Sequence, residues 1–141
     1  MKIAGLRLKN YKQFEDIYLD FTGPDGKPLN KVCFIGRNGT GKSTILNLLM
    51  EMLDNLRPPN FDRNSYFFLK IFIENKFYFI LSSIHIQELV VFTEGIEKEQ
   101  GWFDRLVSLK NINKAVKMFD NYRMPIQTRN EIFDRFDLHK N

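Results

Sequence analysis

The nine residues Gly36-Arg37-Asn38-Gly39-Thr40-Gly41-Lys42-Ser43-Thr44 decide how this chain folds, because they match the phosphate-loop pattern G-x-x-x-x-G-K-S. Glycine leaves the backbone free to curl, so that successive N–H groups point at phosphate oxygens. In this motif Lys42 reaches the β- and γ-phosphates, and the Ser43 hydroxyl completes the coordination of Mg²⁺. The stretch therefore predicts a nucleotide site in which Lys42 is the catalytic residue and Ser43 the metal ligand. A glycine turn that binds nothing is the competing interpretation.

The sequence on both sides of the loop argues for the nucleotide site, because it fits a strand–loop–helix unit. Residues 31–35 form a short apolar run of the kind expected for a buried strand. Residues 43–53 carry an apolar face at helical spacing. The members of that face are Ile45, Leu46, Leu48, Leu49, Met52 and Leu53. This helix would turn its positive end towards the phosphates, and Pro58 and Pro59 would close it off.

Length and composition are those of one globular domain. The 141 residues are 43% hydrophobic and 27% charged, and the net charge of +4 permits contact with nucleic acid without arguing for it. Charged residues interrupt the longest apolar stretches, so no run approaches the roughly 20 residues of a membrane span, and no signal peptide is visible. The single cysteine, Cys33, excludes an internal disulfide, which fits a reducing cytoplasm. Its place before the loop predicts a small buried core residue.

Two half-buried strands are predicted before the loop. Apolar and polar residues alternate in part over residues 2–9 and again over residues 15–21, and residues 10–14 would join these strands. Residues 22–28 include two glycines and two prolines, so they form a loop by composition.

More strands and then helices are predicted after the first helix. Residues 65–73 and 76–82 are rich in Phe, Tyr and Ile and flank Glu74-Asn75, which predicts a β-hairpin, and residues 89–93 add a third strand. Beyond them apolar residues recur at helical spacing. These are Trp102, Leu106, Leu109, Ile112, Val116 and Phe119. Residues 128–131, Thr-Arg-Asn-Glu, predict a capping box that opens a last helix.

Two of these stretches together resemble the ABC-type ATPases of the SMC/RecF/OLD branch. One is the opening Ile3-Ala4-Gly5-Leu6-Arg7-Leu8-Lys9-Asn10-Tyr11-Lys12-Gln13-Phe14 followed by Leu19-Asp20-Phe21, and the other is the phosphate loop. Residues 1–56 carry the resemblance, and residues 65–93 are more loosely similar to the antiparallel β-subdomain of that branch. The resemblance implies an α/β fold of the P-loop NTPase kind. The whole chain would be one lobe, the N-terminal lobe of an ABC/SMC-type head, with a helical segment over 102–140.

The resemblance also implies roles for individual residues. Those implied to bind ATP are Lys12, Gly36, Asn38, Gly39, Thr40, Gly41, Lys42, Ser43 and Thr44. Asn38 would face the γ-phosphate, Ser43 would hold Mg²⁺, and Thr44 would lie near the α-phosphate. Lys12, between the first two strands, would be the basic residue that approaches the nucleotide, with a solvated loop lysine as the competing interpretation. ATP and Mg²⁺ are the implied cofactors, and the lack of an Asn/Thr-Lys-x-Asp motif favours adenine over guanine.

The chain also departs from the pattern of this branch. Such ATPases need an Asp-Glu pair after an apolar strand, where the Asp orders the Mg²⁺ shell and the Glu polarises the attacking water. Glu74 and Glu94 each follow an apolar run, but without the aspartate. A Ser-Gly-Gly signature segment is absent, and so is a switch histidine, because His139 lies at the extreme end and His85 alternates like a structural strand residue. The glutamines that could sense the γ-phosphate, by position only, are Gln87 and Gln100.

With this resemblance, the sequence predicts a cytoplasmic ATP-binding lobe or subunit of an SMC/RecF-like ATPase. Relatives of this architecture close as head-to-tail dimers on two ATP molecules and work on DNA or with a nuclease, in DNA repair or anti-phage defence. The implied partner is a second copy, or a nuclease or ATPase in a hetero-oligomer, and DNA is permitted. Two alternatives stay open. One is a module that binds ATP without hydrolysing it, which the missing Asp-Glu pair supports. The other is a small P-loop kinase, against which the two strands before the loop stand.

Overall fold

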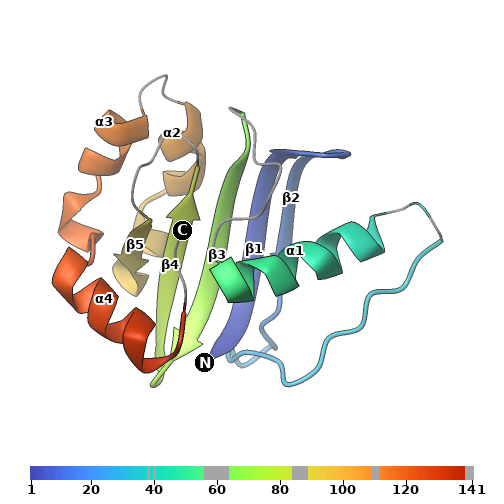
Figure 1. Cartoon of the computed structure of the whole chain (residues 1–141). Coiled ribbons are helices and arrows are strands. Elements are labelled where there is room, and N and C mark those ends of the chain that lie inside the picture. The colour runs from blue at the N-terminus through green and yellow to red at the C-terminus, as the bar shows by residue number, and fades with distance from the viewer. Residues whose placement is uncertain (38, 40, 56–63, 84–88, 109–111, 139–141) are drawn as a thin grey trace.

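One antiparallel sheet of five strands organises the chain (Figure 1). The computed structural model describes residues 1–37, 39, 41–55, 64–83, 89–108 and 112–138. The strands are β1 (Lys2–Tyr11), β2 (Phe14–Asp20), β3 (Tyr66–Ile73), β4 (Lys76–Ser82) and β5 (Val90–Thr93). Their order across the sheet is β2-β1-β3-β4-β5, and all neighbours pair antiparallel. The two strands before the phosphate loop and the three strands after it therefore share one sheet.

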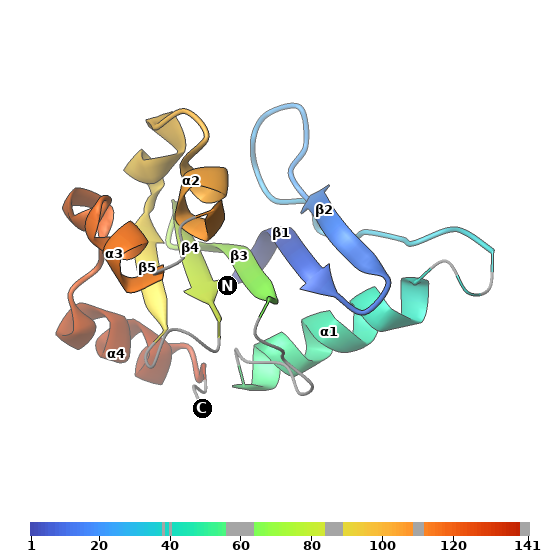
Figure 2. The ribbon, with the colours of Figure 1, turned by 90° about the horizontal axis from the view of Figure 1, so that it is seen from above.

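Helices cover both faces of this sheet. Figure 2 shows α1 (Lys42–Asn55) on one side and α2 (Trp102–Ser108) on the other. The other helical elements are α3 (Ile112–Lys117), α4 (Ile126–Arg135) and the 3-10 helices η1 (Glu94–Lys98) and η2 (Asp120–Tyr122). Within the described residues, no helix combines the length and the apolarity that crossing a membrane requires. The result is an α/β arrangement of three layers, helix–sheet–helix.

The first apolar core lies between the sheet and the helices α1 and α4. Ile45, Leu48 and Met52 of α1 are at most 4% exposed, and they recur at the three- and four-residue spacing of one helix face. The helix predicted over residues 43–53 is therefore confirmed. The residues that pack with it from the sheet and from α4 include Leu6, Leu8, Phe67, Leu69, Ile71 and Phe133.

The second core lies on the opposite face and is rich in aromatic rings. Phe68 and Phe79 stack with their ring centroids 5.1 Å apart, and the edge of Trp102 meets Phe68 at 4.6 Å. Successive strand residues point to opposite faces, so the apolar run of β3 serves both cores, with Phe67 in the first and Phe68 in the second. Burial on both faces explains why β3 is apolar almost throughout.

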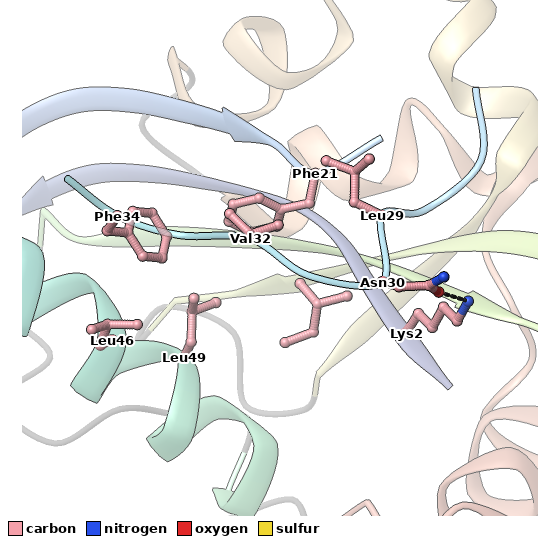
Figure 3. Close-up of a pocket in the computed structure, with 9 residues that line it drawn as sticks. Lys2, Phe21, Leu29, Asn30, Val32, Phe34, Leu46 and Leu49 are labelled. Atoms are coloured by element: carbon pink, nitrogen blue, oxygen red, sulfur yellow. Dashed lines mark hydrogen bonds between the residues drawn. The ribbon is translucent and has the colours of Figure 1, made fainter. Parts of the chain in front are cut away.

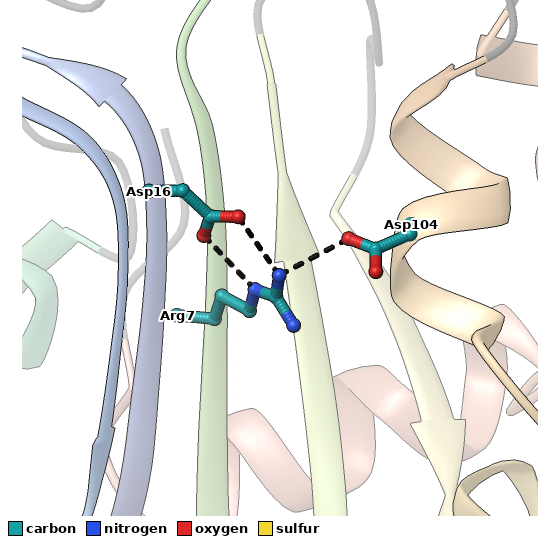
Figure 4. Close-up of polar contacts among 3 residues, drawn as sticks. All are labelled: Arg7, Asp16 and Asp104. Atoms are coloured by element: carbon teal, nitrogen blue, oxygen red, sulfur yellow. Dashed lines mark hydrogen bonds and ion pairs between the residues drawn. The ribbon is translucent and has the colours of Figure 1, made fainter.

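An ion-pair cluster ties α2 to the β1–β2 side of the sheet (Figure 4). The guanidinium of Arg7 donates two hydrogen bonds to the carboxylate of Asp16, at 3.1 and 2.9 Å, and one to Asp104 at 3.1 Å. The same guanidinium lies 4.9 Å from the ring centroid of Phe103. The hydrogen bond from Arg7 lowers the pKa of Asp16 below its ordinary value, so this carboxylate is ionised at neutral pH. Arg7 thus joins β1, β2 and α2.

The β-hairpin around Glu74-Asn75 is confirmed. Ile73 pairs with Lys76, so Glu74 and Asn75 form the turn between them. The φ angles of Glu74 and Asn75 are 51° and 67°. Two positive φ angles in a two-residue loop are those of a type I′ turn, whose twist matches that of the flanking strands. The strands predicted over residues 2–9, 15–21 and 89–93 are also present.

The strand predicted over residues 31–35 is wrong. In Figures 1 and 2 the chain from residue 30 to the phosphate loop runs outside the sheet, beyond β2. It pairs with neither edge strand, and it leaves Ile35 95% exposed and Cys33 exposed rather than buried. An apolar run becomes a strand only where a neighbouring strand takes up its N–H and C=O groups. Among the described residues no strand lies alongside this segment.

The predicted capping box is also wrong. Helix α4 begins at Ile126, with Pro125 before it and no side-chain hydrogen bond at the cap, so Thr128 lies within the first turn. Proline suits this place because its φ angle is close to that of a helix and the missing N–H has no intrahelical partner to lose. Outside the phosphate loop, the predictions that fall on residues beyond the described parts of the chain are those for Pro58, Pro59, His85, Gln87, Leu109 and His139.

Candidate nucleotide-binding site

The phosphate loop leads directly into α1. The helix begins at Lys42, and the N–H of Ile45 donates a hydrogen bond to the carbonyl of Gly41 at 3.0 Å. Gly39 and Gly41 have φ angles of 87° and 98°, which residues with a side chain rarely adopt. The glycines therefore allow the turn that brings the chain into the helix. The N-terminal N–H groups of α1 and its positive dipole end open on this loop.

A cavity of about 310 Å³ lies over the loop. The residues that line it are Gln13, Gly39, Gly41, Lys42, Ser43 and Thr44. The structure thus brings together five of the nine predicted site residues. Gly36 is not among the lining residues, and Asn38 and Thr40 lie outside the described parts of the chain. The volume is at the lower end of the roughly 300–1,000 Å³ found for ligand pockets.

The donors around this cavity suit an anion. Lys42 is half-buried, and its ammonium group donates a hydrogen bond to the carbonyl of Gly36, which holds the side chain against the loop. Ser43 and Thr44 add two hydroxyl groups, and none of the described residues brings a carboxylate to the cavity. An ammonium group, hydroxyls and the N–H groups of a glycine loop are the donors that phosphate oxygens accept from.

The tip of the β1–β2 hairpin, residues 11–14, covers the loop. A Cβ atom at Gly41 would collide with Cζ of Phe14 and would lie 2.8 Å from Nε2 of Gln13. Gly41 is buried by this contact. The hairpin tip and the phosphate loop are therefore in van der Waals contact although about thirty residues separate them along the chain.

Lys12 and Gln13 differ in their relation to the cavity. Tyr11 pairs with Phe14, so Lys12 and Gln13 form the turn at the hairpin tip. The ammonium group of Lys12 lies 5.5 Å from the ring centroid of Tyr11, and Lys12 does not line the cavity, whereas Gln13 does. The sequence reasoning considered Lys12 and missed Gln13. The sequence feature that could have indicated Gln13 is its position next to Lys12, within the opening stretch of residues 3–14.

The two acidic candidates lie at the other end of the sheet. β3 begins beside the end of β1 that carries the hairpin tip and ends beside the start of β1, where Glu74 follows. Glu94 follows β5 at that same end, and its carboxylate accepts a hydrogen bond from the N–H of Phe77 at 3.3 Å. Glu74 pairs instead with Arg135 at 3.2 Å. A strand of eight residues spans roughly 25 Å, so neither carboxylate reaches water in the cavity.

A magnesium ion would find its ligands mainly outside the protein. No three His, Cys, Asp or Glu side chains of the described residues come together as a metal cluster. Mg²⁺ bound with a nucleotide needs few protein ligands, because phosphate oxygens and waters complete its shell. The Ser43 hydroxyl, which lines the cavity, fits the role of such a ligand.

A glycine loop, a helix that begins at its lysine and a cavity above it whose donors suit an anion are the features of a phosphate-loop domain. Comparison with known families places the chain more closely. Residues 1–141 match the family described as AAA ATPase domain, so the chain belongs to this family of ATPases.

One relative is similar to part of the chain. The retron Ec83 probable ATPase of Escherichia coli is 38% identical over 56 residues, which make up 40% of this chain and 10% of that protein. The chain therefore matches about a tenth of the length of this relative.

Proposed function

We propose that the chain is the ATP-binding lobe of an SMC/RecF-like ATPase, which couples ATP binding and hydrolysis to work on DNA or to an associated nuclease. The observation that carries this proposal is the cavity over the phosphate loop, with Lys42, Ser43 and Thr44 on its wall. Membership of the ATPase family supports it, and so does the match to a retron ATPase. A cytoplasmic location fits the single cysteine.

In this proposal the loop and α1 hold Mg·ATP. The N–H groups of the loop and the ammonium group of Lys42 bind the phosphates. The Ser43 hydroxyl binds the Mg²⁺ ion, and the Thr44 hydroxyl lies near the α-phosphate. Lys12 supplies a further positive charge from the hairpin tip. A Mg²⁺ ion held with the nucleotide by the Ser43 hydroxyl would supply charge withdrawal from the phosphate oxygens.

The catalytic carboxylate is proposed to come from a second polypeptide or a further segment. Glu74 and Glu94 are directed to the other end of the sheet, as the strand register requires. A second cavity, of about 360 Å³, offers a surface to which such a partner could bind. It is largely apolar and lies between α1 and the segment before the loop (Figure 3). Leu46 of α1 and Val32 line it and are 47% and 43% exposed. The partner would be a second copy, or a nuclease or ATPase subunit.

Single-turnover hydrolysis of Mg·ATP by the 141-residue chain, with Lys42→Ala as the control, tests this function. We expect the wild-type chain to bind ATP and the Lys42→Ala chain to lose at least tenfold in affinity, because an ammonium–phosphate contact is a charge-assisted hydrogen bond. Hydrolysis by the wild-type chain alone would contradict the proposal that the catalytic carboxylate comes from a second polypeptide or a further segment. An equal affinity of both chains for ATP would contradict the nucleotide site itself.

A module that binds ATP without hydrolysing it is the second function with an observation in its favour. No carboxylate lines the cavity among the described residues. The same assay separates the two functions once the partner is added: hydrolysis that appears with the partner supports the ATPase lobe, and ATP that stays intact supports the binding module. No observation favours the small kinase.

A further inference from the structure

Gln13 is the part of the cavity wall that lies outside the phosphate loop and α1. It reaches the cavity from the hairpin tip, and its Nε2 atom lies 2.8 Å from the place of a Cβ at Gly41. The residue is exposed, and in the part of the chain that the structure describes its amide makes no hydrogen bond. An amide that lines an anion-binding cavity without a partner has its N–H groups available to a ligand.

The hairpin tip that carries Gln13 is anchored to the start of β3 through Asn10 and Tyr11. Tyr11 is 5% exposed, and the edge of its ring meets Phe67 with the centroids 5.1 Å apart. The side-chain amide of Asn10 donates to the carbonyl of Asn64 at 3.0 Å, and the hydroxyl of Ser65 donates to the carbonyl of Asn10 at 2.6 Å. These contacts hold the tip against the start of β3. Gln13 therefore has a fixed backbone position beside the loop before any ligand arrives.

The chemistry of the cavity decides what this amide can do. Among the described residues, the cavity is lined by one cation, Lys42, and two hydroxyls, with no carboxylate, so it suits an anionic ligand. Beside an anion the amide acts through its NH₂ group, which donates, rather than through its carbonyl oxygen, which would be repelled. The amide nitrogen already lies towards Gly41, on the side of the loop.

We propose that Gln13 contacts the nucleotide and donates a hydrogen bond from its side-chain amide to a phosphate oxygen. This inference rests on the proposed ATP site. The hairpin tip would then serve as the second wall of the phosphate site, opposite the loop, and the residue that faces the phosphates from this wall is Gln13.

The test is the affinity of the 141-residue chain for Mg·ATP, measured by titration calorimetry at one ionic strength, for Gln13→Ala, Gln13→Glu and Gln13→Lys. We expect Gln13→Ala to weaken binding about tenfold, as for a hydrogen bond to a charged group. Gln13→Glu should weaken it further, because a carboxylate would face phosphate, and Gln13→Lys should bind at least as well as the wild type. This order by charge is what a purely structural role would not produce.

Two controls make the outcome unambiguous. Gln127→Glu and Gln127→Lys place the same charges on an exposed residue of α4 and should change the affinity less than twofold. Lys42→Ala reports on the ATP site itself. Loss of binding in Lys42→Ala would support the ATP site. If the three Gln13 variants then bind Mg·ATP within twofold of the wild type, or all three weaken binding equally, the role of Gln13 is refuted while the ATP site stands. If the wild-type chain does not bind Mg·ATP, both are refuted.

Discussion

A single glycine shows how the loop depends on a distant part of the chain. Gly41 has a φ angle of 98°, and the ring of Phe14 occupies the space that its Cβ would need. The phosphate motif requires glycine at this position because of the ligand. The structure adds a second reason, since the hairpin tip approaches the backbone too closely for any side chain. Both constraints act on one position.

Gly41→Ala should therefore abolish Mg·ATP binding, because the new methyl group must displace Phe14 or open the loop. Gly101→Ala is the matched control, since Gly101 also has a positive φ angle, 63°, but no atom lies within 4 Å of its Cβ position. We expect a loss of about 1–2 kcal/mol in the free energy of unfolding for the control, from backbone strain alone, with ATP affinity unchanged. Titration calorimetry and urea unfolding measure the two quantities. Equal ATP affinities of Gly41→Ala and the wild type would contradict the contact.

At the scale of the element, α1 has two apolar faces with different surroundings. Leu48 is 2% exposed and packs on the sheet, whereas Leu46, two residues away, is 47% exposed and lines the cavity between α1 and the segment before the loop (Figure 3). A helix apolar on one face needs one neighbouring layer, and a helix apolar on two faces is suited to lie between two layers. One of these layers is the five-stranded sheet.

Leu48→Ala and Leu46→Ala test the two faces of α1 on one helix. Leu48→Ala should lower the free energy of unfolding by about 2–5 kcal/mol, because it leaves a cavity in the first core. Leu46→Ala should change it by less than about 1 kcal/mol, because Leu46 is already 47% exposed to water. Urea unfolding of both variants at neutral pH measures the difference. Equal losses would mean that the outer face of α1 is buried in the isolated chain.

At the scale of the whole molecule, several exposed apolar side chains fall within one stretch of the chain, residues 29–50. Large apolar residues that are at least 43% exposed between residues 29 and 50 are Leu29, Val32, Ile35, Leu46 and Met50. Leu29, Val32 and Leu46 line one largely apolar cavity, and a contiguous exposed apolar patch is typical of an interaction surface. The stretch borders the phosphate loop in sequence, so a partner bound there would sit next to the proposed nucleotide site, where no described residue contributes a carboxylate.

The isolated chain should therefore associate with a second copy through this patch as its concentration rises. The double variant Ile35→Lys and Met50→Lys should remain monomeric in sedimentation velocity, because two ammonium groups would have to be buried in the contact. The matched control is Met118→Lys with Ile126→Lys, since these residues are 52% and 46% exposed elsewhere on the surface. The control should associate like the wild type. A wild-type chain that stays monomeric at every concentration would argue against this use of the patch.

Much of the fold was predictable because its signals are local. The alternation in β1 and β2, the aromatic run of β3 and the helical spacing in α1 follow from side-chain periods of two and 3.6 residues. The turn at Glu74-Asn75 lies where two strand-like runs are separated by two residues. The phosphate loop was predictable for a different reason, since its glycines and its lysine are dictated by the chemistry of the ligand.

The sequence by itself thus determined the class of this protein, most of its strands and helices, and the residues of the loop. Only the tertiary structure decided that residues 31–35 lie outside the sheet, that Gln13 rather than Lys12 lines the cavity, and that Glu74 and Glu94 lie at the far end from it. The physical reason is that strand pairing and wall contacts depend on partners far away along the chain. A local pattern specifies what a segment can form, and its neighbours in space decide what it does form.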